Sequence, residues 1–244
     1  MGLCLYVGNR NYSSWSMRPG VLLRAFDIPF EEKLIRFDSF APDSQFKKTA
    51  LALSPTGNVP ILIDSDVQNR RGAPLVINDT LSIFEYIAEK YPDLSLWPND
   101  LALRTQARNL CAEMHSGFTA LRNHCAMNIG PDLSQAGAII WRDQPSVRAD
   151  VARIEAAWAD CMELSGGPFL CGGFSAVDAY FAPVAMRLKY YGLPVSQQTT
   201  QSYISAVCDH PAVSAWVDQA IATAEFFSFE EPYRLATDAA TAKT

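Results

Sequence analysis

Three features that would assign the chain to a broad class are missing from its 244 residues. No apolar run approaches the roughly 20 residues of a membrane-spanning helix. The N-terminus has no basic region followed by a long apolar stretch, so we expect no secretory signal and a cytoplasmic location. Lysine and arginine do not cluster, and the formal net charge is −6. This balance argues against nucleic acid or an anionic membrane as the main partner.

The cysteines and histidines form no metal or redox motif. The six cysteines are far apart, and no pair of them has C-x-x-C or metal-ligand spacing. Most lie in apolar, helix-like stretches, where a free cysteine behaves as a small buried hydrophobe. The three histidines are scattered, and no H-E-x-x-H motif is present. We therefore expect no metal site and a reducing cellular compartment.

Strand-like and helix-like segments alternate through the first ninety or so residues. Residues 3–7 are a short apolar run typical of a buried strand. Pro19 lacks a backbone N–H and so belongs in the first turn of the helix that follows, which places the helix start near Ser16. The predicted elements are strand 3–7, helix 16–26, strand 32–35, strand 61–63, strand 73–79 and helix 80–90. This is the order of a thioredoxin-like domain.

The pattern changes after the segment YPDLSLWPND, which is rich in proline and aspartate. From residue 101 onward almost every periodic stretch is helical, with apolar residues recurring on one face. We predict an α/β, thioredoxin-like domain over residues 1–91 and an all-helical domain over residues 101–236. The small, polar tail from residue 235 is expected to fray.

The loop YSSWS, after the first predicted strand, has the spacing of a redox motif without its thiols. Ser13 and Ser16 stand where a C-x-x-C loop has its two cysteines. A dithiol reductase needs at least one cysteine at these positions. The sequence therefore argues against dithiol reductase activity.

The segment GNVPILI places a proline directly before a predicted buried strand. Pro60 cannot donate a hydrogen bond to a sheet, so it is either an ordinary turn residue or, in a thioredoxin-like order, a cis-proline. In the second case the N–H and C=O of Val59 stay unpaired and face the serine loop. There they can pair with an extended peptide ligand.

Asp79-Thr80 stands where a predicted strand turns into a helix. One interpretation is a simple N-cap. The other adds a binding role, because helix N–H groups attract a carboxylate while the Asp79 carboxylate can pair with an ammonium group. Together they would hold the zwitterionic end of an amino acid.

In this order and spacing, the segments resemble the cytosolic glutathione transferases. The similarity spans nearly the whole chain and rests on YSSWS…RP, SPTGNVP, NDTLSIFEYI and GPFLCGGFSAVDAYFAPV. The serine loop is most similar to serine-type classes such as zeta and theta, and to their bacterial relatives. The resemblance implies glutathione as co-substrate, a homodimer, and a transferase that activates the glutathione thiolate. The reaction would be attack on a small electrophile by conjugation, dehalogenation or isomerisation. The alternative is a non-catalytic relative that serves as a binding module.

The resemblance also assigns roles within the serine loop. Ser13 matches the hydroxyl that stabilises the thiolate, and Ser14 is the alternative. Arg18 either adds positive potential beside them or forms a salt bridge on the surface. Ser16 is expected to be the helix N-cap, and Trp15 to contribute packing.

Two further groups of residues follow from the resemblance. Glutathione is expected to contact Asn58, Val59, Pro60, Asp79 and Thr80, with the Asp79 carboxylate on the ammonium of the γ-glutamyl end. The electrophile pocket is expected to include Met114, His115 and Phe118. The alternative is that the apolar stripe of Met114 and Phe118 is simply core and that His115 is a structural group. In FSAVDAY, Ser175 and Asp178 form a predicted capping box that stabilises the helical domain and takes no part in the chemistry.

Overall fold

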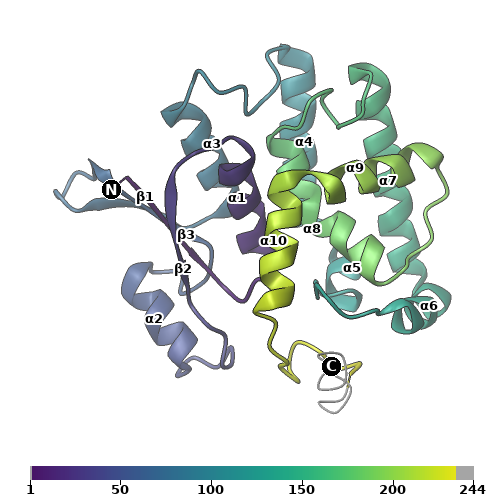
Figure 1. Cartoon of the computed structure of the whole chain (residues 1–244), viewed down its shortest axis with the longest axis horizontal. Helices are drawn as coiled ribbons and strands as arrows, with labels where there is room; N and C mark the ends of the chain where they lie inside the picture. The colour runs from purple at the N-terminus through teal and green to yellow at the C-terminus, as the bar shows by residue number, and fades with distance from the viewer. Residues whose placement is uncertain (1, 235–244) are drawn as a thin grey trace.

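A four-stranded mixed sheet forms the N-terminal part of the chain, which the computed structural model describes from residue 2 to residue 234 (Figure 1). The strands are β1 (Leu3–Val7), β2 (Phe30–Leu34), β3 (Ile61–Gln68) and β4 (Pro74–Ile77), in the order β2-β1-β3-β4. Strand β1 pairs in parallel with β2 and antiparallel with β3, and β4 is antiparallel to β3. This arrangement confirms the predicted thioredoxin-like fold.

Helices cover both faces of the sheet. They are α1 (Ser14–Ala25), α2 (Gln45–Leu53) and α3 (Thr80–Lys90). Leu3, Leu5 and Val7 alternate along β1 and pack with α1 and α3 in the main core, while α2 closes a smaller core on the other face (Figure 1). The sequence pattern does not predict α2, because this nine-residue helix buries only Phe46 and Ala50 and so has a weak apolar pattern.

The first helix begins earlier than predicted. Its N-cap is Ser13, whose side chain accepts a hydrogen bond from the Ser16 amide, and the helix starts at Ser14. The expectation that Ser16 is the N-cap is therefore wrong. Ser16 is fully buried, and its hydroxyl accepts a hydrogen bond from the Gly8 amide.

The C-terminal part consists of helices over its described residues. They are α4 (Leu101–Ser116), α5 (Thr119–His124), α6 (Ser134–Asp143), α7 (Pro145–Ser165), α8 (Ala176–Tyr190), α9 (Gln198–Asp209) and α10 (Pro211–Ala222). Helix α8 is buried along almost its whole length and lies at the centre of this part. Within residues 2–234, no helix is long and apolar enough to cross a membrane. The predicted domain end at residue 236 and the predicted fraying of the tail lie outside the described residues.

Helix α1 joins the two parts by packing against α8 and α10 (Figure 1). A side chain at Gly20 would overlap the Trp216 ring of α10, so glycine allows this close approach. The Trp216 indole N–H also donates to the carbonyl of Arg10, 3.1 Å away. These contacts fix the serine loop at the boundary between the α/β and helical parts.

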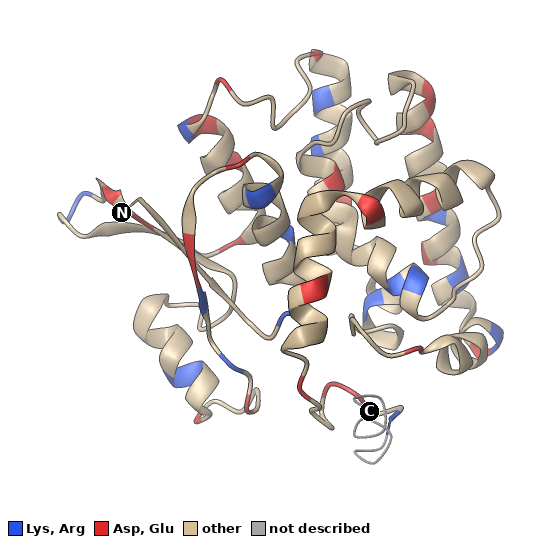
Figure 2. Cartoon of the chain, viewed as in Figure 1, with Lys and Arg blue, Asp and Glu red and all other residues tan. Residues whose placement is uncertain are grey.

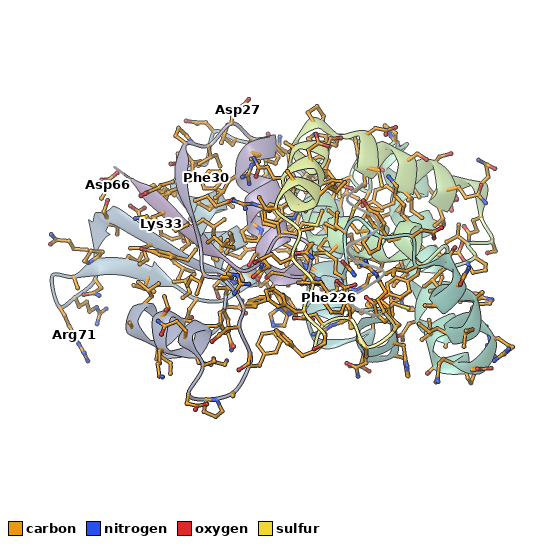
Figure 3. The ribbon with its side chains drawn as sticks, turned by 60° about the horizontal axis from the view of Figure 1, so that its bottom comes forward. Asp27, Phe30, Lys33, Asp66, Arg71 and Phe226 are labelled. Carbon is orange, nitrogen blue, oxygen red and sulfur yellow. The ribbon has the colours of Figure 1, made fainter. Side chains whose placement is uncertain are left out.

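After α10 the chain returns to the α/β part. This C-terminal segment, residues 224–234, is held by Tyr12, whose hydroxyl donates to the carbonyl of Glu225 at 2.7 Å and contacts the Glu231 carboxylate. Figure 3 labels Phe226 in this segment, far from Asp66 and Arg71 on the β3–β4 hairpin. Figure 2 shows acidic and basic residues interspersed over the described ribbon.

The predicted capping box at the start of α8 is confirmed. The buried Asp178 carboxylate accepts hydrogen bonds from the backbone and hydroxyl of Ser175, both at 2.9 Å. It also accepts from the Leu170 amide at 3.0 Å and the Tyr203 hydroxyl at 3.1 Å. Because one carboxylate satisfies four buried donors, Asp178 ties α8 to α9 and to the loop before α8.

We expect Asp178→Ala to lower the free energy of unfolding by about 3 kcal/mol, since it leaves several buried donors without partners. Chemical denaturation measures this loss. The matched control is Asp218→Ala, which removes an exposed carboxylate from α10 and should change stability by less than about 0.5 kcal/mol. If Asp178→Ala abolished activity but left the denaturation midpoint unchanged, the structural role would be wrong.

Candidate functional site

A cavity of about 530 Å³ lies where the serine loop meets the loop before β3, the start of α3, the end of α4 and the C-terminal segment. Its lining residues come from the whole length of the chain. They are Tyr12, Ser13, Ser14, Trp15, Phe37, Phe40, Phe46, Thr56, Asn58, Val59, Pro60, Asn78, Asp79, Thr80, His115 and Glu230. The predicted residues of the serine loop, the Val-Pro segment and the start of α3 thus face one space.

The two adjacent serines differ in their hydrogen bonds. The Ser13 hydroxyl donates to Ser16 Oγ at 2.7 Å and is also the N-cap acceptor of α1. The Ser14 hydroxyl accepts a hydrogen bond from Arg187 Nη2 at 3.2 Å. Among the described residues the Ser14 proton has no protein acceptor, so it is available to a ligand in the cavity. The Ser13 proton is already donated.

The loop before β3 presents backbone groups to the cavity. The Val59–Pro60 peptide bond is cis, which confirms the second of the two interpretations of this proline. Within residues 2–234, neither the N–H nor the C=O of Val59 has a hydrogen-bond partner. Next to it, Lys47 Nζ donates to Asn58 Oδ1 at 2.8 Å and to the Gly57 carbonyl at 2.9 Å. A lysine ammonium therefore lies at this end of the cavity.

Asp79 is the N-cap of α3, as the simpler interpretation predicts. Its Oδ1 accepts hydrogen bonds from the amides of Leu81 and Ser82 at 2.9 and 3.0 Å. These two amides are therefore not free to bind a carboxylate, whereas the Thr80 amide has no partner among the described residues. The other carboxylate oxygen, Oδ2, lies 3.7 Å from His115 Nε2. The Thr80 hydroxyl donates to the Trp15 carbonyl at 3.4 Å and links α3 to the serine loop.

Of the three predicted residues of the electrophile pocket, His115 alone lines the cavity. Its Nδ1 lies 2.9 Å from the Tyr180 hydroxyl, and its ring centroid lies 5.1 Å from that of Trp15. Met114 is 0% exposed and Phe118 is 7% exposed, and both belong to the main core. Their assignment to the pocket is wrong, because the stripe to which they belong packs among the helices.

Arg18 is neither on the surface nor in the cavity lining. Its side chain is 1% exposed, so the salt bridge on the surface is ruled out. The guanidinium lies over the rings of Trp15 and Tyr180, at 4.2 and 4.6 Å from their centroids, and Nε donates to the Tyr180 carbonyl at 2.8 Å. Burial lowers the pKa of Arg18 to about 9, so it remains a cation at neutral pH, behind Trp15.

Comparisons with known proteins bear on this site. A model of the glutathione S-transferase N-terminal domain matches residues 12–90, and one of the C-terminal domain matches residues 104–219. The chain belongs to the glutathione transferase family. It is 37% identical to glutathione S-transferase Z1 of Arabidopsis thaliana over 122 residues, which are 50% of this chain and 49% of the relative. It is 27% identical to a zeta-class glutathione S-transferase of Euphorbia esula over 175 residues, 70% of this chain and 68% of the relative.

The chain spans about half the length of several other relatives. One is a probable maleylacetoacetate isomerase of Caenorhabditis elegans, 30% identical over 49% of each chain. Among solved structures, a Burkholderia glutathione transferase homologue with bound glutathione has a TM-score of 0.63 and 23% identity, over 90% of this chain and 98% of that one. A tau-class enzyme of Mangifera indica has a TM-score of 0.64 and 19% identity, over 91% and 97%. At these identities the structural matches show the shared fold.

The sequence motifs do not predict every residue of the site. The lining residues without a prediction are Tyr12, Phe37, Phe40, Phe46, Thr56, Asn78 and Glu230, and Lys47 and Arg187 contact lining residues without having been predicted. Lys47 lies on the helix that was not predicted, and Glu230 and Arg187 belong to distant segments without a motif of their own. Arg187 lies on α8, 173 residues from the hydroxyl that it contacts. The one sequence signal for Arg187 is that it is a charged residue in an otherwise apolar stretch of α8.

Proposed function

We propose that this glutathione transferase family member is an enzyme that binds glutathione in the cavity and activates its thiol for attack on a small electrophile. The proposal rests on the convergence of a free serine hydroxyl, the unpaired Val59 backbone and the Asp79 carboxylate around one space. A free thiol has a pKa of roughly 8.5 and is mostly protonated at neutral pH. A hydroxyl donor at the N-terminus of α1 favours the thiolate, which is the attacking form.

We assign the thiolate-stabilising hydroxyl to Ser14. The family resemblance matches Ser13 to this role, but Ser13 donates its proton to Ser16 and caps the helix. Ser14 lines the cavity with its proton free, and a buried guanidinium holds its oxygen. Ser13 then acts by keeping the loop in shape.

Glutathione fits the remaining groups in an extended conformation. Its cysteinyl backbone would pair with the N–H and C=O of Val59, next to Pro60. The ammonium group of the γ-glutamyl end would meet the free oxygen of Asp79, with Thr80 beside it. At the other end, the glycyl carboxylate would accept hydrogen bonds from the Asn58 side-chain amide and from the Lys47 ammonium. Lys47 is already positioned there by its hydrogen bonds to Asn58 Oδ1 and the Gly57 carbonyl. The Burkholderia homologue named above was solved with glutathione bound, which supports this choice of ligand.

A glutathione-affinity resin combined with an activity assay tests the proposal. We expect retention on the resin, elution by free glutathione, and turnover of a neutral aryl halide that depends on glutathione. Retention without turnover of any electrophile class would favour the non-catalytic binding module. Failure to bind glutathione would contradict the proposal outright.

Asp79 offers a test of glutathione binding that is separate from activation. Asp79→Asn keeps an oxygen to cap α3 and removes the charge, so it should raise the KM for glutathione with little change in kcat. Losing a charge-assisted hydrogen bond costs about 1.5–3 kcal/mol, or roughly a 10- to 150-fold rise. Asp79→Ala should show the same rise and, in addition, lose about 1 kcal/mol of stability with the cap. A kcat that falls while KM stays constant would contradict this role.

We also propose that the protein is a homodimer in the cytoplasm. The family resemblance supports the dimer, and the six cysteines, all free thiols in the described residues, suit a reducing compartment. Light scattering at micromolar concentration should give twice the chain mass of 26.9 kDa. A single species with the mass of one chain would contradict the dimer.

A further inference from the structure

Two arginines lie buried behind the serine loop without a carboxylate. Arg18 is 1% exposed and Arg187 is 5% exposed. Among the described residues, no aspartate or glutamate forms an ion pair with either of them. Their hydrogen-bond acceptors are neutral oxygens, and Arg18 Nη1 has no partner in the described part of the chain.

Such an arrangement is unusual, because buried charges are normally paired. Burial, with a smaller contribution from a third guanidinium, Arg122, lowers the pKa of Arg187 to about 10. Arg187 remains fully protonated at neutral pH all the same. The loop that carries Ser13 and Ser14 therefore has uncompensated positive charge directly behind it.

The contacts of Arg187 show where this charge can act. Its Nε donates to the Cys125 carbonyl at 2.9 Å and its Nη1 to the Pro183 carbonyl at 3.2 Å, which fixes the plane of the guanidinium. The remaining nitrogen, Nη2, points to Ser14 Oγ at 3.2 Å. Because this oxygen accepts from a cation, its own O–H is polarised and directed elsewhere, and Ser14 lines the cavity.

We propose that Arg187 is a positioning residue for thiol activation and that, together with Arg18, it supplies the counter-charge for the anion that forms in the cavity. The inference rests on the proposed function. The thiol S–H bond breaks, its proton passes to solvent water and its electron pair stays on sulfur. The thiolate then accepts the Ser14 proton as a hydrogen bond, and Arg187 stabilises the negative charge through the Ser14 oxygen. The thiolate of the activated substrate thus provides the negative charge that the two buried arginines lack.

The test is the pKa of glutathione bound to the enzyme, followed by the ultraviolet absorbance of the thiolate. Arg187→Gln removes the charge but keeps an N–H donor, and Arg187→Lys keeps the charge. We expect Arg187→Gln to raise the bound thiol pKa by about one unit, which lowers the ratio of thiolate to thiol about tenfold at a given pH. Arg187→Lys should recover at least half of this shift. The control, Arg104→Gln, removes an arginine of α4 that also donates to loop carbonyls, and should leave the titration unchanged.

A double variant distinguishes an effect of Arg187 through the Ser14 hydroxyl from a general loss of structure. If Arg187 acts through the hydroxyl, Arg187→Gln should shift the pKa much less in a Ser14→Ala background than in the wild type. Equal shifts in both backgrounds, or equal shifts for Gln and Lys, would overturn the proposal. If Arg187→Gln does not fold, Ser14→Ala alone tests the proposal. An unchanged pKa of the bound thiol in Ser14→Ala would rule out an effect of Arg187 through the Ser14 hydroxyl. A wild type that never lowers the thiol pKa would contradict the proposed function itself.

Discussion

Ser14→Ala is expected to lower kcat about 10- to 100-fold at neutral pH while changing glutathione binding by much less. The hydroxyl favours the charged sulfur over the neutral thiol, and this difference sets the fraction of attacking thiolate. Loss of one preorganised donor to a developing oxyanion costs about 100- to 1,000-fold. Sulfur accepts hydrogen bonds more weakly than oxygen, which places the expected loss a factor of ten lower. Steady-state kinetics at saturating glutathione measures it.

Ser13→Ala is the matched comparison one residue away. It removes the N-cap of α1 and the hydrogen bond to Ser16, so it should lower stability by about 1 kcal/mol. Its kcat per folded molecule should fall less than that of Ser14→Ala. If Ser13→Ala caused the larger kinetic loss in a fully folded protein, the catalytic hydroxyl would be Ser13, and the hydrogen bonds described above would change on ligand binding.

The second large effect concerns the charge of the electrophile. Asp79 and Glu230 are the acidic residues that line the cavity, while Lys47 lies beside Asn58 and the buried Arg187 lies behind Ser14. With glutathione bound as proposed, Asp79, Lys47 and Arg187 face the ammonium, the glycyl carboxylate and the thiolate of glutathione, so the charge left to face the electrophile is that of Glu230. Burial and the neighbouring Glu231 raise the pKa of Glu230 to about 7, so its negative charge grows as pH rises through neutrality. The cavity should therefore prefer a neutral aromatic electrophile, which can also contact its phenylalanines, over a dianionic maleyl compound.

Glu230→Gln should reduce this preference. One charge at close range is worth about one pKa unit, or tenfold. We therefore expect kcat/KM for a maleyl dianion to rise about tenfold relative to that for a neutral aryl halide at pH 8, and less at pH 6, where Glu230 is mostly protonated. The control is Glu163→Gln, an exposed carboxylate of α7, which should leave the ratio constant. A wild type that strongly prefers the dianion would contradict this account and favour isomerisation.

The sequence was sufficient for the fold class and for three segments of the cavity wall in the α/β part, but not for α2 or for the lining residues Phe37, Phe40 and Phe46. The serine loop, the Val-Pro pair and the Asp79-Thr80 step are local motifs, in which neighbouring residues determine the geometry. The choice between Ser13 and Ser14 could not be made in this way. Two adjacent hydroxyls look alike in a sequence, and what distinguishes them is a guanidinium on α8.

The helical part was harder for the same reason. The apolar stripe of α4 gives no indication of whether it packs among the other helices or faces the cavity, and Met114 and Phe118, expected in the pocket, pack in the core. Glu230 reaches the cavity because Tyr12, Asn9 and Arg36 hold the C-terminal segment against the α/β part. Such contacts between distant segments leave no periodic signal in either segment.

The most direct measurement of the central claim is the ultraviolet titration of glutathione bound to the wild-type protein. If the cavity activates the thiol through Ser14, the bound thiol should titrate at least one unit below the roughly 8.5 of a free thiol, and Ser14→Ala should return it most of the way. A bound thiol that titrates at the free value in the wild type, or whose pKa does not change in Ser14→Ala, would contradict the claim.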